Sequence, residues 1–237
     1  MDIQILHMVE GAKQAVGLTV IIDVFRAFTV ETYLMRNNAQ KIIPVGDVQI
    51  AYDYKKAHPD TTLLCGERHG KIIDGFDYGN SPSDLEHLDL SGKTVIHTTS
   101  AGTQGIANAI HADEILTGSL VNAKAIAAYI KAKAPEKVSL VCMGLMANKQ
   151  TEEDNLCAEY IKSLLEGTPL PDIYAQMDDL KNTSGAKFFD PAQNHVFPRR
   201  DFELCVKLNS VPFVLRLKKD PDGLDYMERI DVPNSVD

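Results

Sequence analysis

The sequence predicts an α/β protein with three layers, in which helices cover both faces of a largely parallel or mixed sheet. Short runs rich in Val and Ile recur along the chain without the alternation of a half-exposed strand, which is typical of strands buried on both faces. Segments of helical periodicity separate these runs. The chain has 237 residues, of which 44% are hydrophobic, so it can form one domain with a large core.

The apolar runs predict eight strands in chain order. They are Ile3–Met8, Leu18–Val24, Lys41–Val45, Thr62–Cys65, Thr94–His97, Glu114–Thr117, Val138–Val141 and Val211–Leu217.

The clearest predicted helix is "NAKAIAAYIKAK", which places Ile126, Tyr129 and Ile130 on one face and begins at Asn122, a favourable N-cap residue. Towards the C-terminus, "SGAKFFDPAQNHVFPRRD" has the composition of a loop, and it leads into a helix over "RRDFELCVKLN". The end of the chain predicts a hairpin that turns at Asp220–Gly223.

A faint internal repeat suggests how the single domain, residues 1–237, is organised. The series "TVIIDV", helix, "QKIIPV", helix, "TTLLCGE" is similar to "KTVIHT", helix, "DEILTG", helix, "VSLVCMG". Two βαβαβ units over about 18–66 and 93–144, followed by a C-terminal helix and hairpin, would account for it. Chance similarity between α/β units is the alternative.

The composition excludes several classes of protein. The formal net charge of −9 opposes nonspecific binding to nucleic acid or to an anionic membrane. No apolar run approaches the roughly 20 residues of a membrane span, and the N-terminus lacks the pattern of a signal peptide. The four cysteines have no paired spacing, so we expect buried, reduced thiols in a cytoplasmic protein and no zinc site.

Polar side chains follow several predicted strands, at the carboxyl ends where open α/β sheets bind ligands. A glycine-rich acidic stretch, "GERHGKIIDGFDYGNSPSD", follows the fourth strand, and the hydroxyl-rich turn "HTTSAGTQG" follows the fifth. The candidate residues at these strand ends are Asp23, Arg26, Glu67, Arg68, Asp77, Asn80, Ser81, Thr98, Thr99, Gly102, Thr103, Glu153 and Asp154.

These residue types suit phosphoryl chemistry with a metal ion. Carboxylates that outnumber the basic residues favour Mg²⁺, which takes a few protein oxygens together with substrate phosphate. Two arginines and a turn at a helix N-terminus favour the phosphate itself. The glycines of the acidic stretch are expected to let its backbone approach these ligands closely.

Each residue also has a structural interpretation. Asp23 could cap the following helix, and "TEED" at Thr151–Asp154 is close to a capping box. Arg26 and Arg68 could be surface or ion-paired residues. The turn "TTSAGT" lacks the GK[ST] ending of a Walker A loop, and "DVFRA" lacks the second Asp of the haloacid-dehalogenase motif.

Four segments together resemble the 2-phosphosulfolactate phosphatase (ComB) family. They are "IIDVFRAFT", "GERHGKIIDGFDYGNSP", "TVIHTTSAGT" and "TEEDNLCAEYI", which stand in the family's order and spacing over roughly Leu18–Ile161. The resemblance implies an α/β/α phosphatase that depends on Mg²⁺ and converts a small phosphorylated hydroxy acid to 3-sulfolactate and inorganic phosphate.

By position, the resemblance also implies roles for the candidate residues. Catalysis would involve Asp23, Arg26, Glu67 and Arg68, with either Asp23 or a metal-bound water as nucleophile. Substrate phosphate would be bound by Asn80, Ser81, Thr98, Thr99, Gly102 and Thr103. Mg²⁺ would be bound by Asp23, Glu67, Asp77, Glu153 and Asp154.

The sequence departs from the family pattern at His69, at Ala101 and over "CMGLMANKQ", all in loops expected to face the substrate. The alternatives are a phosphatase with a different substrate, an enzyme that performs phosphoryl transfer or isomerisation with similar residues, and a noncatalytic protein that binds anionic metabolites. The expected partner is a small phosphorylated anion, with neither nucleic acid nor membrane, and a homo-oligomer is compatible with the sequence.

Overall fold

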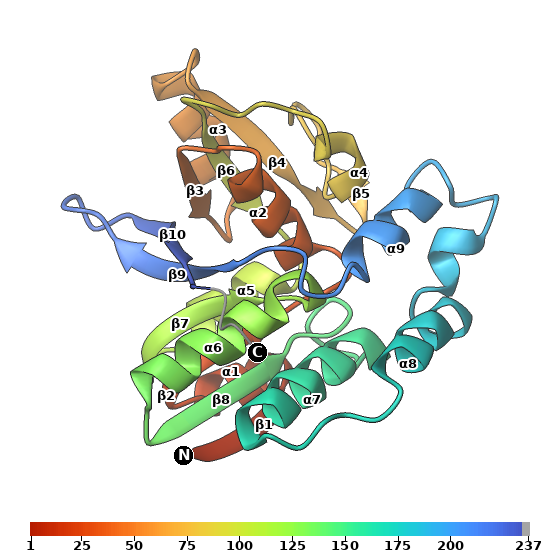
Figure 1. The fold of residues 1–237 in the computed structure, drawn as a ribbon. Helices are drawn as coiled ribbons and strands as arrows, with labels where there is room; N and C mark the ends of the chain where they lie inside the picture. The colour runs from red at the N-terminus through yellow and green to blue at the C-terminus, as the bar shows by residue number, and fades with distance from the viewer. Residues whose placement is uncertain (234–237) are drawn as a thin grey trace.

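The computed structural model describes residues 1–233, which form one mixed ten-stranded sheet with helices on both faces (Figure 1). The strands are β1 (Asp2–His7), β2 (Gly17–Ile22), β3 (Lys41–Pro44), β4 (Thr62–Arg68), β5 (Lys71–Ile72), β6 (Thr94–Thr98), β7 (Ala112–Gly118), β8 (Lys137–Cys142), β9 (Phe213–Lys219) and β10 (Asp225–Asp231). The three-layer α/β prediction is confirmed.

The helices differ in length, and several short 3₁₀ segments accompany them. The α-helices are α1 (Met8–Gln14), α2 (Ala27–Arg36), α3 (Val48–Ala57), α4 (Pro82–Leu85), α5 (Gly102–Asn108), α6 (Ala123–Lys133), α7 (Glu152–Glu166), α8 (Ile173–Asp179) and α9 (Arg199–Cys205). The 3₁₀ segments are η1 (Leu120–Asn122), η2 (Leu180–Asn182) and η3 (Ala186–Phe189).

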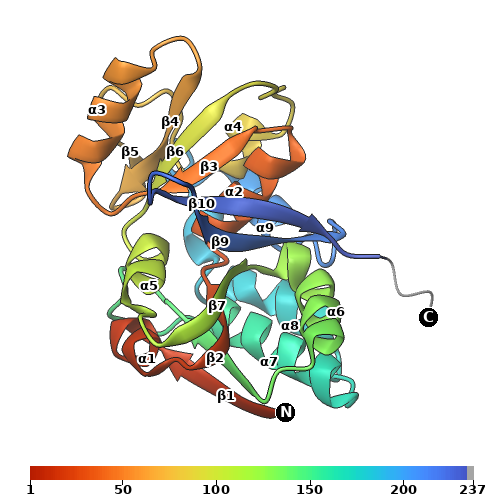
Figure 2. The same cartoon turned by 90° about the vertical axis from the view of Figure 1, so that its left-hand side faces the viewer.

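The sheet consists of two parallel blocks joined by an antiparallel hairpin. Its order is β1-β8-β2-β7-β9-β10-β3-β6-β4-β5, and β9 and β10 run antiparallel to their neighbours in both blocks. Figure 2 shows this C-terminal hairpin lying between the two blocks. The predicted hairpin is therefore confirmed, and it makes the two blocks one continuous sheet.

The two segments of the proposed repeat exchange their first strands. β2 lies between β8 and β7, whereas the next strands of its own segment, β3 and β4, lie on either side of β6. The strands that the repeat equates therefore hold equivalent places in the two blocks, but 18–66 and 93–144 do not fold as separate halves. The duplication itself stays a prediction.

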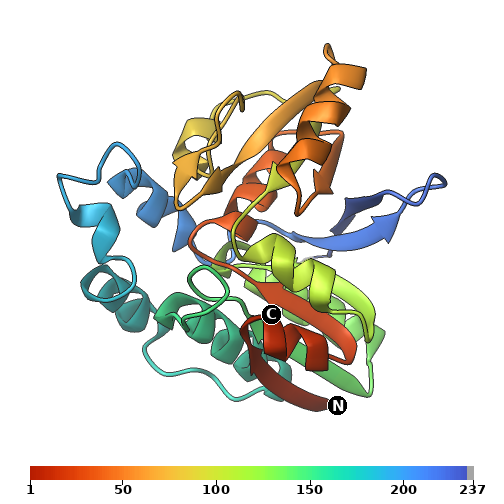
Figure 3. The same ribbon diagram turned by 180° about the vertical axis from the view of Figure 1, so that it is seen from behind.

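Burial on both faces explains why the predicted strands lack polar alternation. On β2, Val20 and Ile22 pack in the cluster that includes α6 and α7, whereas Ile21 packs in the cluster that includes α1 and α5. Figure 3 shows α1 and α5 on the face opposite to α6 and α7. In the other block, α2 and α4 cover one face and α3 covers the other.

All eight predicted strands are present, and their bounds differ by a few residues. The most consequential difference is in β4, which continues to Arg68, so that Glu67 and Arg68 belong to a strand and not to a loop. The short strand β5 and the helix α1 were not predicted. The four cysteines are buried and free, as expected. Among residues 1–233, none of the helices combines the length and hydropathy that a membrane span needs.

Candidate active site

A cavity of about 550 Å³ opens where the carboxyl ends of strands from both blocks meet. Because β2 and β6 each lead across to the opposite block, the loops after β2, β4, β6 and β8 all reach this cavity. Its wall is formed by Asp23, Phe25, Arg26, Ala27, Glu67, His69, Gly70, Asn80, Thr99, Ser100, Ala101, the loop 144–153, Thr183, Ser184, Lys187 and Phe197.

Asp23 lies directly after β2 and is 7% exposed. The pKa of its carboxyl group is raised to about 7, chiefly by burial and also by the charges of Glu67 and Glu153. The Ala27 backbone N–H and the Lys187 ammonium oppose this rise in the pKa of Asp23. Arg26, and not Asp23, occupies the N-cap position of α2, so Asp23 contacts the helix start without being its cap.

Glu67 faces the cavity and connects two loops. Its Oε1 accepts the Ser100 N–H at 2.7 Å, and its Oε2 accepts the Gly70 N–H at 2.7 Å. Glu67 therefore holds the β6–α5 turn against the segment after β4, and its charge acts on Asp23 from a fixed position. The Ser100 amide that the turn was expected to offer to phosphate is already used.

Glu153 lies in the first turn of α7 and is 3% exposed. Burial raises the pKa of Glu153, and the Ser184 hydroxyl and the Lys187 ammonium limit the rise. Its Oε2, the Thr151 hydroxyl and the Ser184 hydroxyl are buried together and have no hydrogen-bond partner outside this group in the described residues. Three such polar groups on one cavity wall suit a polar ligand or a cation.

Lys187, in η3, is the cationic group on this wall that the sequence did not indicate. Burial lowers its pKa, while the charges of Glu153 and Asp23 raise it. Its Nζ lies 5.2 Å from the Phe197 ring centre and 5.4 Å from that of Phe188. No hydrogen bond or ion pair holds this ammonium among residues 1–233, so it is available to an anion. It was missed because "AKFFD" follows no strand and reads as loop.

Arg26 lines the cavity, but its guanidinium is engaged elsewhere. Its Nη1 donates to Asp201 Oδ2 at 2.7 Å and to the Val196 carbonyl, and its Nη2 donates to the Gly70 carbonyl. Arg26 and Asp201 are 4% and 0% exposed, so they form a buried ion pair. The structure places Arg26 at the cavity, as predicted, but with its Nη atoms donating to the protein, so that it attaches α9 to the cavity wall.

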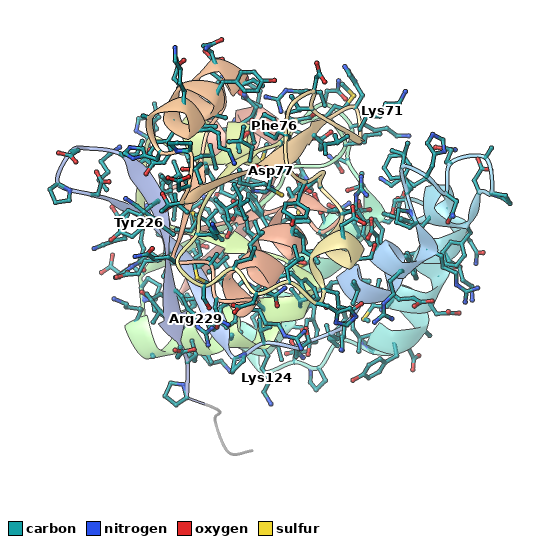
Figure 4. The ribbon with its side chains drawn as sticks, turned by 90° about the horizontal axis from the view of Figure 1, so that it is seen from above. Lys71, Phe76, Asp77, Lys124, Tyr226 and Arg229 are labelled. Carbon is teal, nitrogen blue, oxygen red and sulfur yellow. The ribbon has the colours of Figure 1, made fainter. Side chains whose placement is uncertain are left out.

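Three other predicted residues do not line the cavity. Arg68 points away from it, because neighbouring residues of a strand face opposite sides, and it donates to Thr98 Oγ1 and to the Gly46 carbonyl. Asp77 follows Phe76 in the segment beside β4 (Figure 4), where it accepts the Leu64 N–H and pairs with Lys55. Ser81 donates to Asp201.

Asp154 is fully involved in bracing two loops. Its Oδ1 accepts the Val24 N–H at 2.8 Å, and its Oδ2 accepts the Gly144 N–H at 2.8 Å. Thr151 stands at the N-cap of α7 but makes no capping hydrogen bond, so the capping box expected from "TEED" does not form. The capping interpretation of Asp154 is therefore wrong, and its side chain does not line the cavity.

Only part of the hydroxyl-rich turn after β6 lines the cavity. Thr99 lines the cavity, while its Oγ1 accepts the Thr103 N–H and its carbonyl accepts the Thr103 hydroxyl. Gly102 is required by packing, since a Cβ there would lie 2.9 Å from Phe28 Cζ. Thr98, Gly102 and Thr103 therefore shape the turn without reaching the cavity.

The glycines of the acidic stretch also serve packing. At Gly66 a Cβ would lie 2.3 Å from the Thr98 carbonyl oxygen, and at Gly70, where φ is +79°, it would lie 2.5 Å from the Phe197 ring. Close approach is thus needed, as the sequence suggested, but to the protein's own chain.

The residues fit Mg²⁺ in a particular way. Asp23 and Glu153 supply hard carboxylate oxygens, one of them an orphan, and Glu67 lies close by. Within residues 1–233, no three Asp, Glu, His or Cys side chains are arranged to hold a metal ion by themselves. Mg²⁺ usually keeps waters and takes one or two carboxylates with substrate phosphate. The donors suit an ion completed by water and substrate, and of the five carboxylates predicted as ligands, Asp77 and Asp154 do not line the cavity.

Comparison with known proteins gives one consistent family. The family model described as 2-phosphosulpholactate phosphatase matches residues 5–220. A probable 2-phosphosulfolactate phosphatase of Bacillus subtilis is 31% identical over 215 residues, which cover 90% of this chain and 92% of that protein. One of Caldanaerobacter subterraneus is 36% identical over 179 residues, 75% of this chain and 71% of that protein.

Proposed function

The chain belongs to the 2-phosphosulpholactate phosphatase family, a family of phosphoric monoester hydrolases, and on that premise we propose that it hydrolyses a small phosphorylated hydroxy acid. The substrate is 2-phosphosulfolactate or a close relative, and water converts it to the free hydroxy acid, 3-sulfolactate in the named case, and inorganic phosphate. The observation that carries the proposal is the meeting of Asp23, Glu153 and Lys187, whose ammonium has no hydrogen-bond partner among residues 1–233, in one cavity.

Asp23 is the group assigned to the reacting centre. Two routes are open to it, direct attack on phosphorus and removal of a proton from the attacking water, and both need the ionised carboxylate. The pKa of about 7 leaves Asp23 partly protonated at neutral pH until a cation enters the cavity. Binding of the substrate with its cation thus prepares the carboxylate for the reaction.

Lys187 is assigned to the phosphoryl group. Its ammonium donates hydrogen bonds to phosphate oxygens and balances the charge that develops as the ester bond breaks. Mg²⁺, proposed as the cofactor and held by Asp23 and Glu153, would supply further positive charge to the same oxygens. Glu67 holds the turn and loop in place, so that the cavity keeps its shape when the ligand leaves.

The mouth of the cavity suits the rest of such a substrate. Phe25, Phe197, Leu145 and Met146 line its apolar part, where a short carbon chain would pack. Lys149 and His69, both exposed, stand at its opening and are placed to meet a second anionic group such as a carboxylate or sulfonate.

Phosphate release tests the proposal directly. Purified protein would be assayed with 2-phosphosulfolactate, phospholactate and phosphoglycolate, with Mg²⁺ and with excess chelator. We expect turnover of at least one ester with Mg²⁺ and its loss with chelator. Binding of these esters in titration calorimetry without any phosphate release would instead establish a noncatalytic binding protein.

A further inference from the structure

A buried hydrogen-bonded pair lies behind the cavity wall and contacts a wall residue. Glu31 of α2 and His97 of β6 are both 0% exposed, and His97 Nδ1 lies 3.0 Å from Glu31 Oε1. The other ring nitrogen, His97 Nε2, lies 3.3 Å from Asn80 Oδ1. Of these three residues, only Asn80 lines the cavity.

Glu31 depends on His97 for its hydrogen bonding. Its Oε2 has no hydrogen-bond partner in the described residues, so His97 provides its one hydrogen bond. The neighbouring Cys65 thiol does not replace it, because that thiol donates to the Gly79 carbonyl. Both ring nitrogens of His97 face oxygen atoms, Glu31 Oε1 and Asn80 Oδ1, and this geometry matches a ring that donates from each nitrogen.

The proton on His97 Nε2 determines which atom of the Asn80 side-chain amide, Oδ1 or Nδ2, faces the cavity. With both nitrogens protonated, Nδ1–H donates to Glu31 and Nε2–H donates to Asn80 Oδ1, so the amide oxygen is turned inward. Asn80 Nδ2 makes no hydrogen bond to any described residue and is left to the cavity. A neutral His97 would accept from Nδ2 and present the amide oxygen, which repels an anion.

We propose that Glu31 and His97 are positioning residues that hold Asn80 with its amide N–H groups toward the cavity, as donors to an anionic oxygen of the substrate. The inference rests on the proposed function for the identity of that anion. This role accounts for two buried polar residues that do not line the cavity.

Protonation of His97 can be measured without any turnover. Protein labelled uniformly with ¹³C and ¹⁵N would be studied by NMR near neutral pH, with the His97 ring signals assigned through bonds from its own backbone amide. We expect both ring nitrogens to be protonated in the wild type, and one to lose its proton in Glu31→Gln. An unprotonated Nε2 in the wild type would overturn the proposal, even if no variant folded.

Coupling to the ligand would be measured by calorimetry with inorganic phosphate at fixed Mg²⁺. We expect Asn80→Ala and Glu31→Gln each to weaken phosphate binding by roughly 10- to 100-fold, since each removes one donor to a charged group. The double variant should bind no more weakly than Asn80→Ala, because Glu31 acts through Asn80. Additive losses would overturn the proposal.

Thr32→Val serves as the matched control. Thr32 neighbours Glu31 on α2 and is buried, and its hydroxyl donates only to the Phe28 carbonyl. This change should lower stability and leave phosphate affinity unchanged, which separates a positioning effect from general destabilisation. A protein that binds phosphate with this pattern but turns over no ester would refute the phosphatase and keep the inference.

Discussion

Two groups of buried carboxylates surround the cavity and differ in where their oxygens go. Asp154 and Asp201 lie behind the wall, and each directs both oxygens to donors of the protein: backbone amides for Asp154, and Arg26, Ser81 and the Ser83 N–H for Asp201. Asp23 and Glu153 line the cavity and accept fewer protein donors; burial raises the pKa of both, as it raises that of Asp154, so the two groups differ in their hydrogen bonds and not in the direction of the pKa. Glu67 stands between the groups, since it lines the cavity yet accepts two amides.

The difference shows how one residue type serves structure and chemistry at the same site. A carboxylate with satisfied oxygens stabilises the loops that shape the cavity. A carboxylate left short of donors keeps the capacity to bind a cation or exchange a proton, at a cost in stability. Substitutions in the first group should therefore act on folding, and those in the second on turnover.

The largest effect is expected behind the wall, at the Arg26–Asp201 pair. Arg26→Ala leaves the Asp201 charge buried without its cation and should lower the free energy of unfolding by about 3–5 kcal/mol. Denaturant unfolding would measure it. The double variant with Asp201→Ala should recover part of the loss, because it removes both charges. Equal losses in the single and double variants would show that the pair is not what stabilises this region.

On the cavity side, Asp23→Asn should leave the fold intact and reduce kcat at least about 100-fold, because it removes the charge and keeps the shape. Phosphate release at saturating Mg²⁺ would measure the loss. Asparagine can still accept the Ala27 N–H, so a merely structural Asp23 would tolerate the change. Wild-type turnover in a folded Asp23→Asn variant would remove Asp23 from the reacting centre.

Lys187→Met should lower kcat/KM by roughly 10- to 100-fold through loss of one phosphate donor. It should not lower the melting temperature, because the ammonium is buried without a hydrogen bond and methionine suits the aromatic rings around it. Lys149→Met, at the exposed mouth, is the matched control and should have the smaller effect. A lower melting temperature with unchanged kinetics would give Lys187 a structural role.

The sequence predicts the sheet well because a strand buried on both faces is a continuous apolar run, which can be recognised from its own residues. Runs such as "GLTVII" and "KVSLVC" are apolar on both faces, and polar residues that follow them gather at one end of a parallel block. The positions of Asp23, Glu67 and Glu153 after such strands predict that they lie together, and all three line the cavity.

The contacts within the site and the order of the strands depend on tertiary packing, which leaves no pattern in the local sequence. Asp201 sits in a helix of ordinary composition, and only the docking of α9 makes it a buried partner of Arg26. Arg68 matches a motif, but the extension of β4 turns it away from the cavity. The exchange of β2 and β6 between blocks, which brings four loops to one cavity, cannot be read from the order of strands and helices.

The smallest effect concerns the cost of leaving Asp23 short of donors. The pKa of Asp23 is about 7 in the folded protein and 3.8 is its ordinary value, so the folded state binds this proton more tightly than the unfolded state. Its contribution to stability is therefore full below about pH 4 and is lost as the pH rises through 7.

In excess chelator, wild-type protein should lose about 1–2 kcal/mol of unfolding free energy relative to Asp23→Asn between about pH 5 and pH 8. The loss is smaller than the full shift in pKa would give, because Glu67 and Glu153 share the electrostatic repulsion with Asp23. Denaturant unfolding of both proteins at a series of pH values would measure it. Asparagine has no proton to release, so the variant should overtake the wild type in relative stability as Asp23 ionises. If the unfolding free energies of the wild type and of Asp23→Asn changed in parallel with pH, Asp23 would not be short of hydrogen-bond donors. The distinction between the carboxylates that line the cavity and those behind its wall would then not hold for Asp23.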